Sequence, residues 1–434
     1  MKKFLAMLLA LVMALSLVAC GEKKDDTKTD GDTTATGSVY YLNFKPESDD
    51  AWKALAATYT EKTGVPVKIL TAASGEYEST LVSEMDKEDA PTLFQCNEGG
   101  VATWGEFCYD LSSSDVYNQL TSKDYALKNA DGEVISIAYC LETYGIIVNK
   151  ALLKEAGYEV TDITNFESLK KIADDIHSRA AELGFDAFTS AGLDGTSAWR
   201  FSGHLANMPL FYEFRDEGVT SKPATIKGTY LDNYKAIWDL YITDSATTGA
   251  ALLTATGDQA EAEFGEGKAV FYQNGTWEYS NLTGEKFGMN ADDLTMIPIY
   301  CGIEGEEKAG LCTGTENYWS VNKNASEEDI KATLDFMNWV VTSDAGTTML
   351  AEQFGPCPFK NAKTPENVFF AQANEYVANG NYTVTWAFNW TPAVDDWRAA
   401  VVDALSKYTT GNGSWDDVKT AFVEGWATQY ANEH

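Results

Sequence analysis

The stretch VYYLNFKPESDDAWKALAATYTEKTGVPVKIL, residues 39–70, decides the fold class. Its first six residues combine β-branched and aromatic side chains, which predicts a strand. Ser48 and Asp49 can cap the helix that follows. The apolar residues of that helix recur on one face: Trp52, Leu55, Ala56 and Tyr59. Gly64 and Pro66 end the helix, and residues 67–70 predict a second strand.

The alternation continues, with a further helix near residues 76–88 and a third strand at 92–95. Strand, helix, strand, helix, strand within such a short length is typical of an α/β fold with a parallel sheet. Ligands of such sheets lie at the carboxyl ends of the strands. The stretches NFKPES (43–48) and QCNEGG (95–100) are therefore expected at one crevice.

The rest of the chain alternates in the same way. Strands are predicted at 144–148, 185–189 and 269–272, and helices at 165–183, 230–243, 326–342 and 394–406. The length of 434 residues is too great for one ordinary core, so two α/β domains are expected. The formal charge of −33 argues against nucleic acids and anionic membrane surfaces as partners.

The first residues have the pattern of a secretion signal. Two lysines precede an apolar segment that is too short for a membrane span, and LVAC (17–20) resembles a bacterial lipobox. We therefore expect residues 1–19 to be a signal peptide and Cys20 to be lipidated. Residues 20–37, which contain almost no apolar side chains, are expected to form a flexible linker that holds the soluble part on the outer face of the cell membrane.

Six cysteines follow Cys20, and the chain has three histidines. The absence of a CxxC pair and the few histidines argue against a zinc site. Disulfides are permitted in an exported chain with an even number of cysteines, but free buried thiols fit the sequence equally well. We expect no metal and no cofactor.

Several segments together resemble one family. They are TYTEKTGVPVKI (58–69), YGIIVNKALLKEAG (144–157), GEGKAVFYQNGTWEYSNL (265–282) and YWSVNKNASEEDIKATLDFMNWV (318–340). With the lipobox and the linker, they are similar to the carbohydrate-binding branch of the extracellular solute-binding proteins of bacterial ABC transporters, the relatives of maltose-binding protein. The resemblance covers the chain from about residue 38 to its end.

This resemblance implies two Rossmann-like α/β lobes joined by a hinge that the chain crosses several times, the periplasmic-binding-protein fold of type II. Crossings are expected near 142–143, at 313–315 and between 358 and 365. The N-lobe would then comprise residues 38–143 plus 315–363, and the C-lobe 144–314 plus 364–434. The implied function is a monomeric receptor that binds a neutral oligosaccharide by hinge closure and delivers it to the permease subunits of an importer.

The motif QNGTWEYSN (273–281) follows a predicted strand, and an Asn274-Gly275 turn is expected to end that strand. Trp277 would then emerge at the carboxyl end of the strand, and the resemblance implies that its ring stacks on a sugar. Taken alone, such a ring more often belongs to a core. Glu278 beside it is a candidate at the rim of the site.

The other candidate ligand residues lie on two predicted loops of the N-lobe, at the hinge, where the resemblance implies that Glu142 reaches into the cleft, and on two segments of the C-lobe. A sugar needs flat aromatic faces and polar groups for its hydroxyls, and these residues supply both. In the N-lobe they are Asn43, Lys45, Glu47, Gln95, Asn97, Glu98 and Glu142. In the C-lobe they are Trp199, Arg200, His204, Phe388, Asn389 and Trp390. Gln95 replaces the aromatic residue of the maltose binders, which argues against maltodextrin as the ligand.

Two other functions fit the sequence less well. A surface glycoside hydrolase needs two placed carboxylates, and proximity along the chain means little among 65 acidic residues. The motifs of nucleophile-elbow, P-loop and dinucleotide enzymes do not occur. A solute-binding protein for a polyamine or a peptide is the alternative within the family, because a polyamine site wants several carboxylates in an aromatic box.

Overall fold

A computed structural model describes residues 37–433 of the chain. The predicted signal peptide, Cys20 and the linker up to residue 36 lie outside the described residues. Among residues 37–433, none of the helices has the length and apolar composition that a membrane span requires. All six cysteines of this range are free thiols, and five of them are buried.

The first sheet has the strand order β2-β1-β3-β11-β5-β4. Its strands are β1 (Val39–Asn43), β2 (Val67–Thr71), β3 (Leu93–Phe94), β4 (Ala126–Lys128), β5 (Val134–Ala138) and β11 (Tyr318–Val321). β1 pairs with β2 and β3 in parallel, as the sequence predicts, but β11 is antiparallel to both of its neighbours. The sheet is mixed because β11 returns from a distant part of the chain rather than through a strand–helix–strand crossover.

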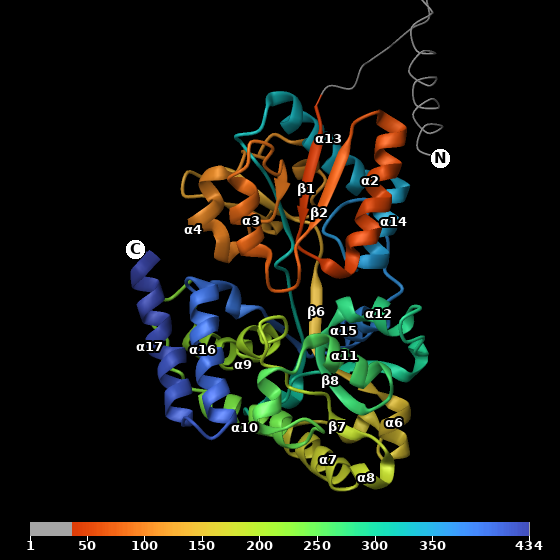
Figure 1. The fold of residues 1–434 in the computed structure, drawn as a ribbon, viewed down its shortest axis with the longest axis vertical. Coiled ribbons are helices and arrows are strands. Elements are labelled where there is room, and N and C mark those ends of the chain that lie inside the picture. The colour runs from red at the N-terminus through yellow and green to blue at the C-terminus, as the bar shows by residue number, and fades with distance from the viewer. Residues whose placement is uncertain (1–36, 434) are drawn as a thin grey trace, which may run out of the picture. The chain divides into compact units, whose positions relative to one another are not determined.

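Four long helices pack beside this sheet. They are α2 (Asp49–Thr63), α3 (Tyr77–Met85), α13 (Glu327–Thr342) and α14 (Asp344–Gln353), with short α4 (Val101–Trp104) and α5 (Asp115–Asn118). Figure 1 shows α2 and α14 side by side next to β1 and β2. Trp52 of α2 is fully buried and packs edge-on against Trp319 of β11, so the predicted apolar face of this helix is the core face.

The second sheet has the order β12-β10-β6-β8-β7, and β9 also pairs with β6. Its strands are β6 (Glu142–Asn149), β7 (Asp186–Phe188), β8 (Ala269–Gly275), β9 (Leu294–Ile297), β10 (Ala309–Gly314) and β12 (Tyr382–Thr385). β6 is antiparallel to β8, β9 and β10, so this sheet is mixed as well. All eight residues of β6 are buried, which makes it the central strand of the second core.

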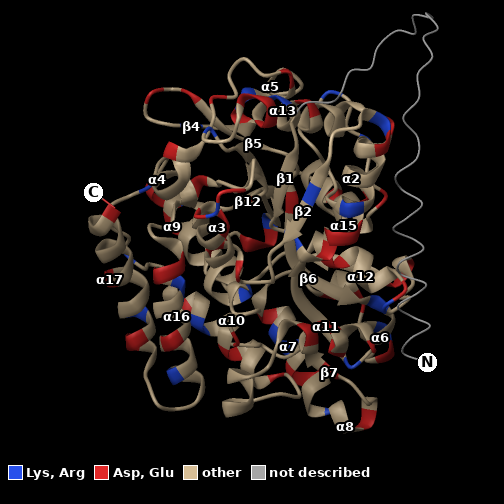
Figure 2. Cartoon of the chain, turned by 45° about the horizontal axis from the view of Figure 1, so that its top comes forward, with Lys and Arg blue, Asp and Glu red and all other residues tan. Residues whose placement is uncertain are grey.

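The helices of the second sheet come from most of the remaining chain. They are α6 (Lys150–Glu155), α7 (Phe166–Ser178), α8 (Ala180–Leu183), α9 (Asn207–Glu217), α10 (Leu231–Thr243), α11 (Gly257–Gly265), α12 (Tyr279–Thr283), α15 (Val368–Ala378), α16 (Val394–Thr409) and α17 (Trp415–Glu433). The single helix predicted at 165–183 is two helices, because it breaks at Arg179. Figure 2 shows aspartate and glutamate residues, in red, along the helices of both sheets.

Each sheet with its helices forms one lobe, called here the first lobe and the second lobe. The chain passes between the two sheets in three segments: residues 139–141, residues 315–317 and the stretch between α14 and α15. The first segment joins β5 to β6, the second joins β10 to β11, and the third joins α14 to α15. Three segments of chain, rather than a single linker, therefore connect the two lobes.

Candidate functional site

A cavity of about 390 Å³ lies between the two lobes, within the range of small-molecule sites. The first lobe contributes loops at the carboxyl ends of β1 and β3 and the start of α3. The second lobe contributes the segment before α9, the residues after β8 and the start of α16. The charged and aromatic residues of the wall are Phe44, Lys45, Glu47, Tyr77, Glu78, Glu142, Trp199, His204, Trp277, Glu316, Trp386, Asp395, Asp396 and Arg398.

Eight of the residues predicted from the sequence lie on this wall. They are Lys45, Glu47, Gln95, Asn97, Glu142, Trp199, His204 and Trp277. The predicted crevice at the carboxyl ends of β1 and β3 is thus one side of the cavity. A role of these eight side chains in binding stays a prediction.

Seven predicted residues do not line the cavity: Asn43, Glu98, Arg200, Glu278, Phe388, Asn389 and Trp390. Asn43 is fully buried and donates from Nδ2 to the carbonyl of Lys45, so it shapes the loop that holds the lysine. Arg200 is also buried, and its guanidinium donates to the carbonyl of Ser190. Glu98 lies in the 3-10 turn Glu98–Gly100 beside the wall residues Asn97 and Gly99.

The predicted aromatic loop at 388–390 packs inward instead. Phe388 is buried, and Trp390 stacks on Phe214 of α9 at a ring distance of 5.8 Å. Asn389 donates from Nδ2 to the carbonyl of Thr315, in the segment that joins the lobes. The sequence shows that this segment is rich in aromatic residues. It does not show which of their rings pack against α9 and which face the cavity.

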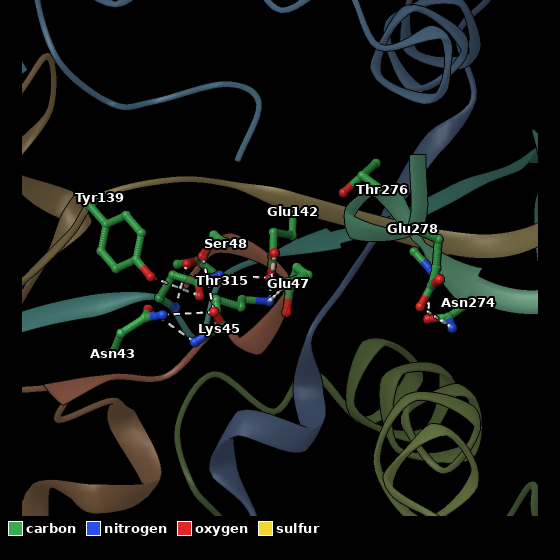
Figure 3. A network of polar contacts seen from close by, with 12 residues as sticks. Asn43, Lys45, Glu47, Ser48, Tyr139, Glu142, Asn274, Thr276, Glu278 and Thr315 are labelled. Atoms are coloured by element: carbon green, nitrogen blue, oxygen red, sulfur yellow. Dashed lines mark hydrogen bonds and ion pairs between the residues drawn. The ribbon is translucent and has the colours of Figure 1, made fainter. Parts of the chain in front are cut away.

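Lys45 is the charged centre of the first-lobe wall (Figure 3). Its ammonium lies 2.7 Å from Glu142 Oε1 and 3.7 Å from Glu47 Oε1. Asn317 donates to the other oxygen of Glu142 at 2.6 Å. Burial lowers the pKa of Lys45, but the two carboxylates outweigh it and hold the pKa above its ordinary value. Lys45 is therefore charged, and it joins β1 to the start of β6.

The second-lobe wall is an aromatic cluster around His204. The imidazole stacks on Tyr144 at 4.0 Å, and its ring centre lies 5.0 Å from Trp199, 5.4 Å from Trp277 and 5.7 Å from Trp386. Burial and three neighbouring cations hold the pKa of His204 well below its usual range, so the ring is neutral. A neutral imidazole can both donate and accept a hydrogen bond.

Two polar atoms of this cluster have no hydrogen-bond partner among the described residues. They are His204 Nδ1 and Trp386 Nε1, and both residues are buried. An unpaired buried polar atom costs about 1–3 kcal/mol. The cluster therefore places flat rings on the cavity wall, together with two buried polar atoms that the described residues leave unpaired.

The predicted turn at Asn274-Gly275 is wrong, because β8 runs through both residues. Their backbones pair with Gly145 and Tyr144 of β6, and Asn274 donates its amide to Tyr272 and Glu278. Gly275 is extended, and a Cβ there would lie 2.2 Å from the Trp277 ring. The strand ends at Gly275, three residues beyond the predicted end at residue 272, and Trp277 reaches the cavity just after its carboxyl end.

Trp277 also faces the first lobe. Its ring centre lies 5.0 Å from the Lys45 ammonium, a distance at which a cation interacts with an aromatic face. On the cavity rim, Ser74 donates from Oγ to the carbonyl of Thr196 at 3.2 Å. Groups of the two lobes are thus in contact at two places along the cavity.

Glu278 lies behind the wall. Burial, with the charges of Glu261 and Glu47, raises its pKa to about 8. The folded chain therefore keeps this proton up to about pH 8, whereas the unfolded chain releases it near 4.5. Between these values the folded state binds more protons, so its stability falls as pH rises, by at most about 1.4 kcal/mol per pH unit.

Glu278→Gln keeps the acceptor for Asn274 and removes the titration. We expect the free energy of unfolding of this variant to decline less between about pH 5 and pH 8 than that of the wild type. Urea titrations at several pH values measure it, with exposed Glu285→Gln as the matched control. Equal slopes in the wild type and the Glu278 variant would show that the carboxyl is already ionised in the folded protein.

Among the charged residues and the tryptophans of the wall, sequence reasoning missed six. They are Glu78, Glu316, Trp386, Asp395, Asp396 and Arg398. Arg398 lies 3.7 Å from Glu316, and Glu78 accepts from Trp104 Nε1 at 2.7 Å. The first turns of α3 and α16 carry three of them, at the helix starts that follow predicted loops. That position, rather than the residue types, was the available signal.

A family model described as bacterial extracellular solute-binding protein matches residues 54–378. The maltodextrin-binding protein MdxE of Bacillus subtilis strain 168 is 23% identical over 345 residues, which are 76% of this chain and 75% of MdxE. The structure of RafE in complex with raffinose is similar with a TM-score of 0.70, 16% identity and coverage of 89% of this chain and 99% of RafE. A chitin oligosaccharide binding protein has a TM-score of 0.71 at 16% identity, with coverage of 92% and 100%.

Proposed function

The chain belongs to the bacterial extracellular solute-binding proteins, and from this premise we propose that it is a receptor that binds an oligosaccharide between its lobes for an ABC importer. Its family and its curated relative are solute-binding proteins, not enzymes. The relative MdxE is a maltodextrin-binding protein, and the two similar structures are a complex of RafE with raffinose and a chitin oligosaccharide binding protein.

The observation that carries the proposal is the cluster of Trp199, Trp277 and Trp386 around His204. Sugars present flat C–H faces with hydroxyls at their edges, so they suit rings that stand beside polar atoms. The unpaired Nδ1 of His204 and Nε1 of Trp386 lie in the same cluster. Opposite them, the Lys45–Glu142–Glu47 group supplies both donors and acceptors.

The proposed mechanism is closure of the two lobes. The three segments of chain that connect the sheets act as the hinge, which supports lobe boundaries of 38–143 plus 315–363 and 144–314 plus 364–434. A ligand that contacts both walls shifts the population toward the closed form.

We also propose that lipidated Cys20 holds the receptor at the outer face of the membrane, and that the receptor is a monomer. Mass spectrometry of the mature N-terminus tests the lipidation. Light scattering tests the monomeric state.

Calorimetry with a panel of α- and β-linked oligosaccharides tests the receptor function. At least one sugar is expected to bind with a Kd near 1 μM, which corresponds to about −8 kcal/mol. Mass spectrometry after prolonged incubation is expected to show the sugar intact. The proposal is wrong if no glycan of the panel binds, and a cleaved sugar would point to a hydrolase instead.

A further inference from the structure

The two cations of the cavity wall, Lys45 and Arg398, are engaged to different degrees. The ammonium of Lys45 lies 2.7 Å from Glu142, and the side chain of Lys45 is 10% exposed. Arg398 has one ion pair among residues 37–433, with Glu316 at 3.7 Å, and these two side chains are 20% and 21% exposed. A separation of 3.7 Å is too long for a hydrogen bond between the partners. Arg398 is therefore the cation whose N–H groups the described residues leave unused.

The unused polar atoms of Arg398 and Glu316 are accessible. Within the described chain, neither the guanidinium nor the carboxylate takes part in a hydrogen bond, and none of their polar atoms is among the buried unpaired ones. His204 Nδ1 and Trp386 Nε1, by contrast, are shielded. Because Arg398 and Glu316 both line the cavity, the exposed part of each side chain can contact a ligand there.

Glycine at position 203 makes room for the guanidinium. A Cβ at Gly203 would lie 2.9 Å from Nη2, 3.3 Å from Cζ and 3.4 Å from Nε of Arg398, so the guanidinium packs on the backbone at this glycine. Its Cζ atom also lies 5.4 Å from the centre of the Phe388 ring, within the range of a cation–π contact. These two contacts position the guanidinium and leave its hydrogen-bond donors free.

The backbone at Gly203 belongs to an unusual element. Arg200–Leu205 is a π-helical turn, and all six of its residues are buried. Such turns are rare, and they occur frequently at functional sites. His204, the next residue, stands in the aromatic cluster of the cavity wall. One turn thus places the imidazole beside the tryptophans and provides the surface on which Arg398 packs.

Resting on the proposed function, we propose that Arg398 and Glu316 bind hydroxyls of the sugar, and that Gly203 is a positioning residue for Arg398. The guanidinium is a rigid fork of N–H donors, so it donates to two adjacent hydroxyl groups, while Glu316 accepts from one of them. A hydroxyl that accepts from Arg398 and donates to Glu316 bridges the gap of 3.7 Å. Glu316 lies in the connecting segment 315–317, so this contact joins the sugar to the hinge. The receptor therefore requires a sugar with two free neighbouring hydroxyls at this place.

Calorimetry with maltotriose, raffinose and triacetylchitotriose tests this inference, and each variant is measured with the probe that binds the wild type most tightly. Arg398→Met is expected to weaken binding at least about tenfold, because it removes hydrogen bonds from a charged donor. Glu316→Gln is expected to weaken binding about fivefold, because a neutral acceptor forms a weaker bond. Arg215→Met is the control, since Arg215 of the second lobe pairs with Asp216 and does not line the cavity. It is expected to change the affinity less than about twofold.

Gly203→Ala separates a role through Arg398 from a purely structural one. The three atoms nearest to the added methyl group all belong to the flexible end of Arg398, so we expect the guanidinium to move while the fold persists. Affinity is expected to fall at least about fivefold. In the Arg398→Met background the side chain ends before Nη2, and Gly203→Ala is expected to change the affinity less than about twofold. Gly195→Ala is the control, because a Cβ there would meet no atom within 4 Å.

Urea denaturation checks that each variant folds. If a probe binds the wild type and Arg398→Met loses less than about threefold in affinity, this inference is wrong and the proposed function stands. Equal losses from Gly203→Ala in the two backgrounds would overturn the positioning role of Gly203. If neither the three probes nor any other glycan of the panel binds, the receptor proposal fails, and this inference fails with it.

Discussion

Replacement of Lys45 by methionine is expected to lower the free energy of unfolding by about 3–5 kcal/mol. The substitution keeps most of the volume of the side chain but leaves Glu142 and Glu47 without their cation. The side chain of Glu142 is 5% exposed, so water cannot replace the lost charge. Removal of one partner of a buried ion pair costs more than the pair itself contributes, because the remaining charge stays desolvated.

Urea denaturation followed by tryptophan fluorescence measures this loss. Lys53→Met is the matched control, because Lys53 forms an exposed pair with Asp49 at 2.6 Å and its loss is expected to cost less than about 1 kcal/mol. Adding Glu142→Gln to the Lys45 variant is expected to restore part of the stability. If Lys45→Met costs no more than Lys53→Met, water reaches the carboxylates of Glu142 and Glu47, and the buried ion pair does not stabilise the fold.

The second large effect is expected on affinity. Trp277→Ala is predicted to weaken binding of the tightest sugar of the panel by at least about 30-fold, equivalent to about 2 kcal/mol, as for a central aromatic anchor. The ring faces the cavity from the end of β8 and contacts both the His204 cluster and Lys45. Its removal deletes a stacking surface while the strand that presents it stays paired with β6.

Trp390→Ala is the control for this experiment. It also removes a half-buried tryptophan of the second lobe, but its ring stacks on Phe214 and does not line the cavity. Affinity is expected to change less than about threefold in this variant. Circular dichroism checks that both variants keep the fold. Unchanged affinity after Trp277→Ala, with the fold intact, would place the sugar elsewhere.

The sequence alone was enough to predict the strands and helices at the start of the first lobe and part of the first-lobe wall of the cavity. Alternation of strands and helices predicts β1, α2 and β2, because each needs only local periodicity and caps. The loops after β1 and β3 follow from the rule that ligands lie at strand ends, and Lys45 and Gln95 lie on the wall as expected.

What the sequence could not supply depends on contacts between distant segments. The residues 274 and 275 have the composition of a turn, yet pairing with β6 keeps them extended. Arg200 and Trp390 have the chemistry of a sugar site, but packing turns them away from the cavity. Asp395 and Glu78 line one cavity from different lobes, so neither residue carries a local signal of that placement.

The central position of β11 has a consequence for the order in which the protein matures during synthesis. β11 fills the place between β3 and β5, yet residues 142–314 are made before it. Until residue 321 has left the ribosome, both neighbouring strands keep a row of unpaired backbone groups, which is the kind of edge that recruits other chains. The lobe whose sequence begins first is thus completed only after most of the other lobe has been translated.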